Sequence, residues 1–365
     1  MRTLLLAFLL TSFLGINDVL AQKYSNEFLN IGVSARSQAM GGAMAAGVDD
    51  VTAGYWNPAG LSFVKDNPQI SAMHAEWFAG IGAYDYVGVA LPLADNKRTL
   101  GLSFIRFGID NIPNTLSLYE SDGTINYDNI VPFSAADYAF LASYAQPIGT
   151  KGFHFGGSVK VIRRIIGPFA SSWGFGLDAG IQYRPNKNLR LGVVIKDMTS
   201  TFNAWRFNFT DDEKEVLEIT GNDIPINSVE VTNPQIVLGA AYAMNFGDFG
   251  LLAETNFTLF TDGQRNTIIS ADPISIDPIL GLEMDFKKFL YFRLGANKLQ
   301  EETDLTGEKY WGLHPTLGVG LKVKKLSIDY AFTNVGESDI TYSHIVSFKL
   351  EINRAFMKQA LKRKN

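Results

Sequence analysis

The sequence predicts an all-β protein: a transmembrane antiparallel β-barrel of about 14 strands with an N-terminal helical hatch in its lumen. Three observations support this fold class. Segments of strand length, in which apolar residues alternate with small or polar ones, occupy the chain from Gln69 to Ile352. Their connections alternate between tight turns and longer, often acidic loops, as in barrels of the outer membrane. After the first residues, no apolar run approaches the roughly 20 residues of a membrane-spanning helix.

Residues 1–21 have the pattern of a secretory signal peptide. Arg2 precedes an apolar run from Leu4 to Leu14, and the small-residue pattern Val19-Leu20-Ala21 offers a cleavage site before Gln22. The chain contains no cysteine, which excludes disulfides, thiol catalysis, thiolate metal ligands and lipid attachment at a cysteine. We therefore expect an exported protein.

Residues 22–68 form the second predicted unit, a hatch or plug. The stretch from Phe28 to Leu61 is rich in small residues and lacks strand alternation. Asn57-Pro58 suits a helix start, because the asparagine side chain accepts from free backbone donors and proline has no donor to leave unpaired. Gly41-Gly42 permits a sharp turn or a close approach to the barrel wall. An ordinary N-terminal loop with a short helix is the alternative to a plug in the lumen.

The barrel is predicted to span residues 69–352. The segments beginning at Leu326 and Tyr342 show the alternation most clearly, with one face suited to lipid and the other to a polar interior. Longer connections are predicted at residues 108–134, 198–233, 261–275 and 299–313. This order gives an even number of strands and places both termini in the periplasm. The alternative is a large secreted β-sandwich or jelly roll. The predicted tight turns are Ala94–Arg98, Gly149–Gly152, Pro185–Asn188, Phe246–Phe249, Phe286–Lys288 and Val323–Lys325.

Charged residues on the inward register of these strands form a candidate lumen network. Mixed signs predict internal ion pairs rather than an ion-selective ring, because unpaired charges in a narrow barrel are costly. A charged transport path is the alternative. The candidate network comprises Lys160, Asp178, Glu254, Arg293 and Asp329, and Lys196, Glu283 and Asp285 share its register.

Residues 353–365 form a basic tail, which we expect in the periplasm. Lysine and arginine alternate there with apolar residues, which suits a short amphipathic helix on the inner leaflet or on a periplasmic partner. A frayed tail is the alternative. The net charge of −5 gives no basic surface for nucleic acid, and we expect no nucleic-acid partner.

We expect no enzyme, no catalytic residues, no metal and no other cofactor. The histidines are His74, His154, His314 and His344, and none has a helical metal-binding spacing such as H-E-x-x-H. Acidic pairs suit helix caps and solvated loops better than a calcium loop or a glycosidase pair. A lipid hydrolase or acyltransferase with Ser, His and acid on the outer wall is the enzymatic alternative.

Four short motifs stand out in the N-terminal segment: Ala35-Arg36, Ala39-Met40-Gly41-Gly42-Ala43, Asp49-Asp50 and Asn57-Pro58-Ala59-Gly60-Leu61. Together they resemble the hatch signature of FadL-like outer-membrane barrels, and more narrowly that of the PorV/PorQ family. The resemblance implies a fourteen-stranded barrel with an N-terminal hatch, in agreement with the strand pattern. The hatch residues it assigns are Arg36, Met40, Gly41, Gly42, Asp49, Asp50, Asn57, Pro58, Ala59, Gly60 and Leu61.

The resemblance implies two functions. FadL-like members carry long-chain fatty acids or aromatic hydrocarbons across the outer membrane, whereas the PorV/PorQ group is associated with type IX secretion. We expect an accessory or cargo-docking subunit of a surface secretion or assembly machine, because the acidic stretch from Asp211 to Glu218 repels fatty-acid carboxylates. A passive transporter of long-chain fatty acids or other lipophilic molecules is the alternative. The expected partners are outer-membrane lipid and lipopolysaccharide, proteins of such a complex and, in the alternative, a lipophilic ligand.

Overall fold

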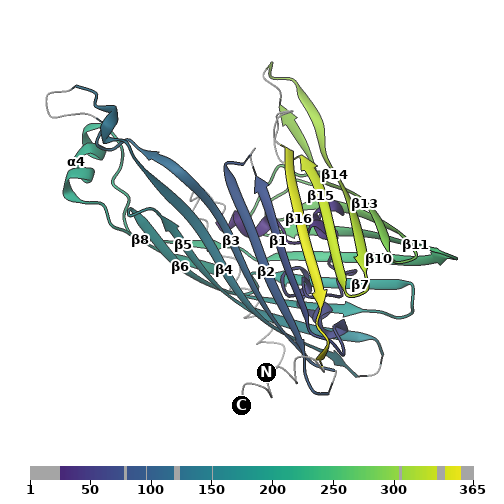
Figure 1. Ribbon diagram of the computed structural model, residues 1–365. Helices are drawn as coiled ribbons and strands as arrows, with labels where there is room; N and C mark the ends of the chain where they lie inside the picture. Colours follow the sequence, from purple (N-terminus) through teal and green to yellow (C-terminus); the bar gives the residue numbers. More distant parts are fainter. Residues whose placement is uncertain are drawn as a thin grey trace, which may run out of the picture.

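The computed structural model is built almost wholly from antiparallel strands (Figure 1). It describes residues 25–77, 80–95, 97–118, 124–149, 151–303, 306–334 and 342–354. The predicted signal peptide and the tail beyond Arg354 therefore lie outside the described residues. The strands are β1 (Gln69–Trp77), β2 (Gly82–Pro92), β3 (Thr99–Asn114), β4 (Val131–Ile148), β5 (Phe153–Ile166), β6 (Ala170–Tyr183), β7 (Leu189–Lys196), β8 (Thr201–Phe207), β9 (Ser228–Thr232), β10 (Gln235–Phe246), β11 (Phe249–Phe260), β12 (Ser275–Phe286), β13 (Leu290–Thr303), β14 (Lys309–Val323), β15 (Leu326–Asn334) and β16 (Tyr342–Glu351).

The strands close into a ring. Neighbouring strands pair in the order β5-β4-β3-β2-β1-β16-β15-β14-β13-β12-β11-β10-β7-β6, and β6 returns to β5. These 14 strands form the closed barrel, while β8 and β9 extend it at one end. The predicted all-β fold, its antiparallel pairing and its closure are confirmed. A sandwich or jelly roll is excluded, because closure leaves the ring itself without a free edge.

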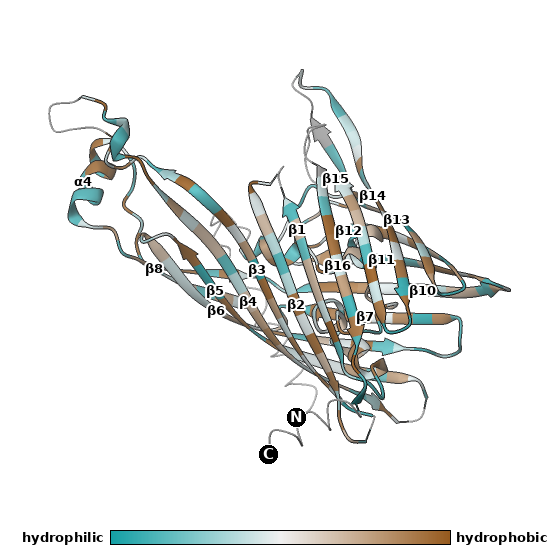
Figure 2. Ribbon diagram, in the orientation of Figure 1, coloured by the Kyte–Doolittle hydropathy of each residue, from teal (hydrophilic) through white to brown (hydrophobic). Residues whose placement is uncertain are grey.

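Side chains alternate between the two faces of the wall as predicted. In β16, Val346 and Phe348 are exposed on the outer face, whereas Ser347 is 2% exposed on the inner face. In β6, Trp173 and Phe175 lie outside and Ser172 inside. Figure 2 shows the resulting bands of brown and teal along the strands. The outer band supplies the apolar surface that a bilayer requires.

The tight turns lie where they were predicted, but several loops are shorter than expected. The predicted loop 108–134 is wrong at both ends, because β3 runs to Asn114 and β4 begins at Val131. The predicted loop 299–313 shrinks in the same way, since β13 and β14 continue to Thr303 and from Lys309. Small or polar residues interrupt the apolar alternation near the ends of these strands. The backbone nevertheless stays paired with the neighbouring strand beyond that point. Figure 1 shows these extended strands flaring apart at the upper end of the barrel.

The predicted connection 198–233 contains structure of its own. Strand β7 stops at Lys196, and Asp197 and Ser200 adopt positive φ before the chain resumes as β8. The lower half of β6 therefore pairs with β7 and its upper half with β8. Between β8 and β9 lies helix α4 (Asp211–Ile219), which begins with a capping box of Thr210 and Glu213. The acidic stretch of the sequence is thus an exposed helix, visible at the upper left of Figure 1.

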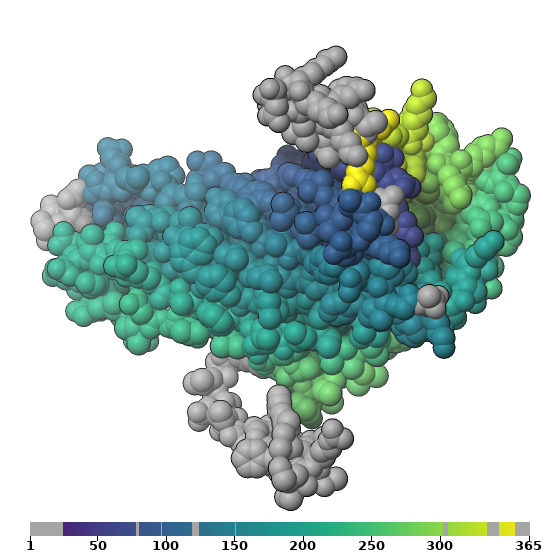
Figure 3. All heavy atoms as spheres, turned by 90° about the horizontal axis from the view of Figure 1, so that it is seen from below, coloured from purple at the N-terminus to yellow at the C-terminus, as the bar shows by residue number. Residues whose placement is uncertain are grey.

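Residues 25–64, here the N-terminal segment, pack inside the barrel. The segment contains η1 (Glu27–Asn30), α2 (Ala35–Ala39), α3 (Ala53–Trp56) and η2 (Pro58–Phe63). Its apolar side chains share buried clusters with inward residues of the wall, such as Tyr84, Tyr86 and Ile105. Asn57 accepts a hydrogen bond from the Ala59 amide at the start of η2, with Pro58 in the first position, as predicted. From below, purple atoms of the segment are visible in small patches among the atoms of the barrel (Figure 3).

Glycines in the wall let the backbone of the segment come close. A Cβ atom on Gly295 would lie 2.2 Å from the backbone nitrogen of Gly41, and one on Gly281 would lie 2.7 Å from the carbonyl oxygen of Met40. Gly41 itself has a φ of 66°, which favours glycine. The predicted close approach to the wall is therefore present at Gly41, whereas Gly42 lies against Trp56 of the segment itself.

Candidate functional site

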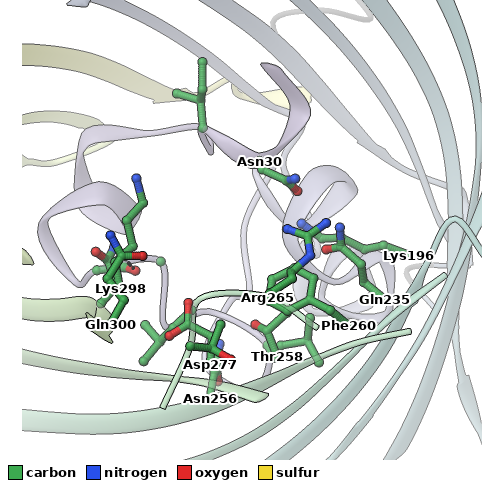
Figure 4. A pocket seen from close by; sticks show the side chains of 18 of the residues that line it. Asn30, Lys196, Gln235, Asn256, Thr258, Phe260, Arg265, Asp277, Lys298 and Gln300 are labelled. Carbon is green, nitrogen blue, oxygen red and sulfur yellow. Dashed lines mark hydrogen bonds between the residues drawn. The ribbon is translucent and has the colours of Figure 1, made fainter. Parts of the chain in front are cut away.

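A cavity of about 390 Å³ lies in the lumen between the N-terminal segment and the wall. Its wall side is made by β7 and β10 to β13, and its opposite side by residues around Asn30, Gln38 and Trp56. Lys196 and Gln235 lie together on one side, Thr258 and Asp277 lower down, and Lys298 and Gln300 across from them (Figure 4). This volume is in the range of small-molecule sites. We call it the lumen cavity.

The strand pairing explains why these side chains converge. Lys196 is directly opposite Gln235 on the inner face of β7 and β10, and Gln235 is opposite Phe260 on β11. Thr258 and Asp277 form the corresponding pair of β11 and β12. Because alternate residues of a strand point inward, all five side chains share one face of the wall.

The lining combines polar and apolar groups. The ammonium of Lys196 lies 4.7 Å from the ring centre of Tyr55 and 5.4 Å from that of Trp56. The guanidinium of Arg265 covers Phe260 at 4.0 Å and binds the carboxylate of Asp262. Apolar contact comes also from Ile31, Val237 and Ile279. The cavity thus offers both hydrogen-bonding groups and apolar surface.

The structure places the candidate network in two separate ion-pair groups. Lys160 binds Asp178 at 2.8 Å and Asp197 at 2.5 Å. Arg293 binds Glu283 at 2.6 Å and Asp329 at 2.7 Å. The structure therefore pairs these charges internally rather than lining an open path with them.

Other candidates lie outside these groups. Glu254 is buried and accepts the backbone amide of Ala46 at 2.8 Å, so it anchors the N-terminal segment. Asp285 lies near the β12–β13 turn, where it accepts the Lys288 amide. Lys196 makes no ion pair with any described residue, because Lys160 holds the neighbouring carboxylates.

Charged residues of the N-terminal segment bind the wall. Arg36 makes a two-pronged contact with Glu283, with Nε 2.7 Å and Nη2 3.0 Å from its oxygens. Asp50 binds Lys349 at 2.5 Å, and Asp49 lies 3.2 Å from Arg190. The sequence singled out Arg36, Asp49, Asp50 and Glu283 but not Lys349 or Arg190, because alternation alone cannot pair residues that lie far apart in the chain.

The environment of Asp50 favours its charged form. Burial raises the pKa of this carboxyl, but attraction by Lys349 and Arg36 and hydrogen bonds from Lys349 and Thr52 hold it well below its usual range. The stabilisation is therefore present at neutral pH and is lost only as the pH falls through this depressed pKa. Asp50 is a permanent anionic anchor rather than a switch near neutrality.

The remaining motif residues are packing positions. Met40 and Leu61 are completely buried, and Ala59 and Gly60 pack under residues 48 and 53 and against β5. The Asn57 amide donates to the carbonyl of Ala45 at 2.6 Å. Gly42 lies below the Trp56 ring and lines the lumen cavity.

Among the residues that the structure describes, no group of three His, Asp or Glu side chains could hold a metal ion. Ser62 approaches His154 at 2.6 Å, while the same hydroxyl donates to the Ala59 carbonyl. In the described part of the chain, no helix is long and apolar enough to cross a membrane.

Comparison with known proteins identifies the fold. No family model and no curated protein sequence matches the chain. The chain is similar to the toluene transporter TodX of P. putida, at 14% identity and a TM-score of 0.54 over 88% of this chain and 99% of that chain. It is also similar to the CymD monoaromatic hydrocarbon channel, at 12% identity and a TM-score of 0.54 over 91% of this chain and 100% of that chain.

A FadL homologue of Pseudomonas aeruginosa matches at 12% identity and a TM-score of 0.51, over 88% of this chain and 98% of that chain. The protein thus has the closed 14-strand barrel fold of FadL-like outer-membrane proteins. The narrower resemblance to the PorV/PorQ family finds no match among these comparisons.

The anchor formed by Asp50 and Lys349 gives a testable prediction. Asp50→Asn leaves the partly buried lysine without its counter-charge and should lower the free energy of unfolding by about 3–5 kcal/mol. Adding Lys349→Met should recover much of that loss, because no buried charge is then unpaired. Urea unfolding of the refolded barrel in vesicles measures both values. Asp211→Asn, at an exposed pair on α4, is the control and should change nothing measurable. Equal stability of Asp50→Asn and the parent would show that the anchor contributes nothing.

Proposed function

We propose that this protein is a passive transporter that admits a small, partly lipophilic molecule through the outer membrane. The observation that carries the proposal is the lumen cavity, which lies between the wall and the N-terminal segment and combines Trp56, Phe260 and Ile279 with hydrogen-bonding groups. A site inside the barrel serves passage of a ligand, whereas docking of a protein requires an outer surface. The similarity in fold to hydrocarbon channels supports this choice over a role in type IX secretion.

We also propose that the N-terminal segment acts as the hatch of this transporter. Its support is the set of contacts that fix it in the lumen: two ion-paired anchors, buried apolar clusters and close backbone contact with Gly281 and Gly295. Passage of a ligand then requires a local shift of the segment, because its backbone touches the wall beside the lumen cavity. The exposed acidic helix α4 remains available as a surface for other macromolecules, but nothing in its contacts specifies one.

The orientation follows from the connections. Short turns lie at one end of the barrel, and α4 with the longest loops lies at the other (Figure 1). In outer-membrane barrels the short turns are periplasmic. We therefore place α4 outside the cell and the chain termini in the periplasm.

Uptake tests the proposed function. Cells that lack the protein should accumulate labelled toluene or oleate several-fold more slowly than the parent, because the lipopolysaccharide leaflet hinders lipophilic molecules. Their surface proteome, measured by mass spectrometry after shaving, should be unchanged. Unchanged uptake together with loss of surface proteins would reject transport and favour the docking role.

Removal of residues 34–57 tests the hatch. The shortened protein should keep its folded, heat-modifiable barrel and show a large increase in single-channel conductance in planar bilayers, because the lumen loses its filling. Deletion of residues 211–220 removes α4 without touching the lumen and is the matched control. A parent protein that already conducts as a wide, open pore would contradict the hatch proposal.

Cysteine labelling tests the orientation, helped by a parent chain that contains no cysteine. Asp212→Cys on α4 should react with an impermeant maleimide on intact cells, whereas Lys187→Cys in the β6–β7 turn should react only after lysis. Both sites are exposed, so accessibility of the side chain does not limit the reaction. The reverse pattern of labelling would invert the topology.

A further inference from the structure

One face of the lumen cavity carries polar groups that no described residue satisfies. We call Lys196, Gln235, Thr258 and Asp277 the polar strip. They stand on β7, β10, β11 and β12, four neighbouring strands of the ring, and all four line the cavity. The strip therefore runs across the wall, opposite the N-terminal segment.

Side chains of the polar strip are buried without a hydrogen-bond partner among the described residues, which indicates a ligand site. Gln235 is 6% exposed and Thr258 is 8% exposed, and neither side chain hydrogen-bonds to a described residue. The Oδ1 atom of Asp277 is buried and also has no hydrogen-bond partner in the described structure. Native proteins satisfy the great majority of buried polar atoms, because an unsatisfied one lowers the stability of the fold. A ligand with complementary groups would remove this cost.

Lys196 supplies the charge that selects the ligand. The nearby carboxylates of Asp178 and Asp197 both bind Lys160, so Lys196 makes no ion pair with a described residue and its ammonium lies over the rings of Tyr55 and Trp56. Arg265 is held by Asp262, and Lys298, across the cavity, is attracted by the carboxylate of Asp277. The ammonium of Lys196 is therefore the cation at this end of the strip that can receive an anion.

The spacing of the strip sets the shape of the ligand. Lys196 and Asp277 stand three strand spacings apart, which is ~14 Å between their backbones, and the long lysine side chain reaches into that gap. Phe260, Val237 and Ile279 line the cavity between or beside them. A ligand that engages both ends must be elongated, with an apolar body between two polar ends.

We propose that the lumen cavity binds an amphipathic hydroxy acid. Its carboxylate accepts from Lys196 and Gln235, its apolar body lies on Phe260 and Trp56, and a remote hydroxyl donates to Asp277. This inference rests on the proposed transport function and names the chemical class of its ligand. A pure hydrocarbon does not match this site, because it would leave the four polar groups of the strip without hydrogen-bond partners.

Calorimetry with a matched series of probes tests the proposal on the purified full-length barrel. The probes are p-coumarate, which has both polar ends, cinnamate, which lacks the hydroxyl, 4-propylphenol, which lacks the carboxylate, and toluene, which lacks both. p-Coumarate should bind most tightly, and each missing end should weaken binding by roughly tenfold or more, in line with the strength of hydrogen bonds to charged groups.

Two variants test which residue binds each end of the ligand. Lys196→Met should weaken p-coumarate binding by roughly tenfold or more and leave 4-propylphenol binding unchanged. Asp277→Asn should weaken p-coumarate binding and leave cinnamate binding unchanged. Lys287→Met in the β12–β13 turn removes an exposed lysine at the other end of the barrel and should affect no probe. Heat-modifiable mobility in gels confirms that each variant is folded.

Three results would overturn the inference. If toluene or 4-propylphenol binds as tightly as p-coumarate, the ligand is lipophilic, and the proposed transport function stands without the polar strip. If no probe binds, the inference fails, and the uptake assay in cells then decides independently whether the protein transports anything. Binding of p-coumarate that is equal in the parent, Lys196→Met and Asp277→Asn would place the ligand elsewhere.

Discussion

Every backbone amide and carbonyl in the wall needs a hydrogen-bond partner on a neighbouring strand, because the hydrocarbon of a membrane offers none. This requirement closes the ring by pairing β1 with β16 and β5 with β6. It also explains the break between β7 and β8. Where β7 stops, the upper half of β6 takes β8 as its partner, and the Met198 amide donates to the Leu177 carbonyl at 2.8 Å. The pairing of β6 therefore continues past the irregular segment, from β7 to β8.

A closed wall leaves an interior that has to be filled, and this protein fills it unevenly. Small residues let the backbone of the N-terminal segment lie against Gly281 and Gly295. Elsewhere on the same part of the wall, Lys196, Gln235, Thr258 and Asp277 face a cavity instead of protein. Ion pairs such as Asp50 with Lys349 hold the segment in place. The cavity remains open because these contacts fix the N-terminal segment at defined points, so that it does not pack against the whole wall.

The sequence predicted correctly the features that depend on a single strand or turn. Period-two alternation predicted which side of the wall Ser347 and Phe348 would face, and short polar stretches located the turns. The break after Lys196 gave no such signal, since no glycine or proline marks it. Regular alternation would turn Asp197 outward, whereas the break turns it inward onto Lys160. Its role in that ion pair was missed for this reason. The lumen cavity was missed because its lining comes from eight elements that only the closed ring brings together.

The contacts of the N-terminal segment span most of the chain. The Ala35 amide donates to the Ser347 hydroxyl at 3.1 Å, and the Ala46 amide donates to Glu254 at 2.8 Å. The segment therefore reaches its final surroundings only after strands that leave the ribosome much later are in place. Such non-local contacts make folding slow, because loop-closure entropy is lost before the contacts compensate for it. Until the last strand pairs with the first, the small-residue segment and both open edges of the sheet remain exposed. Assembly of this barrel thus depends on keeping an incomplete sheet and its future filling together, because premature pairing with another chain is the competing reaction.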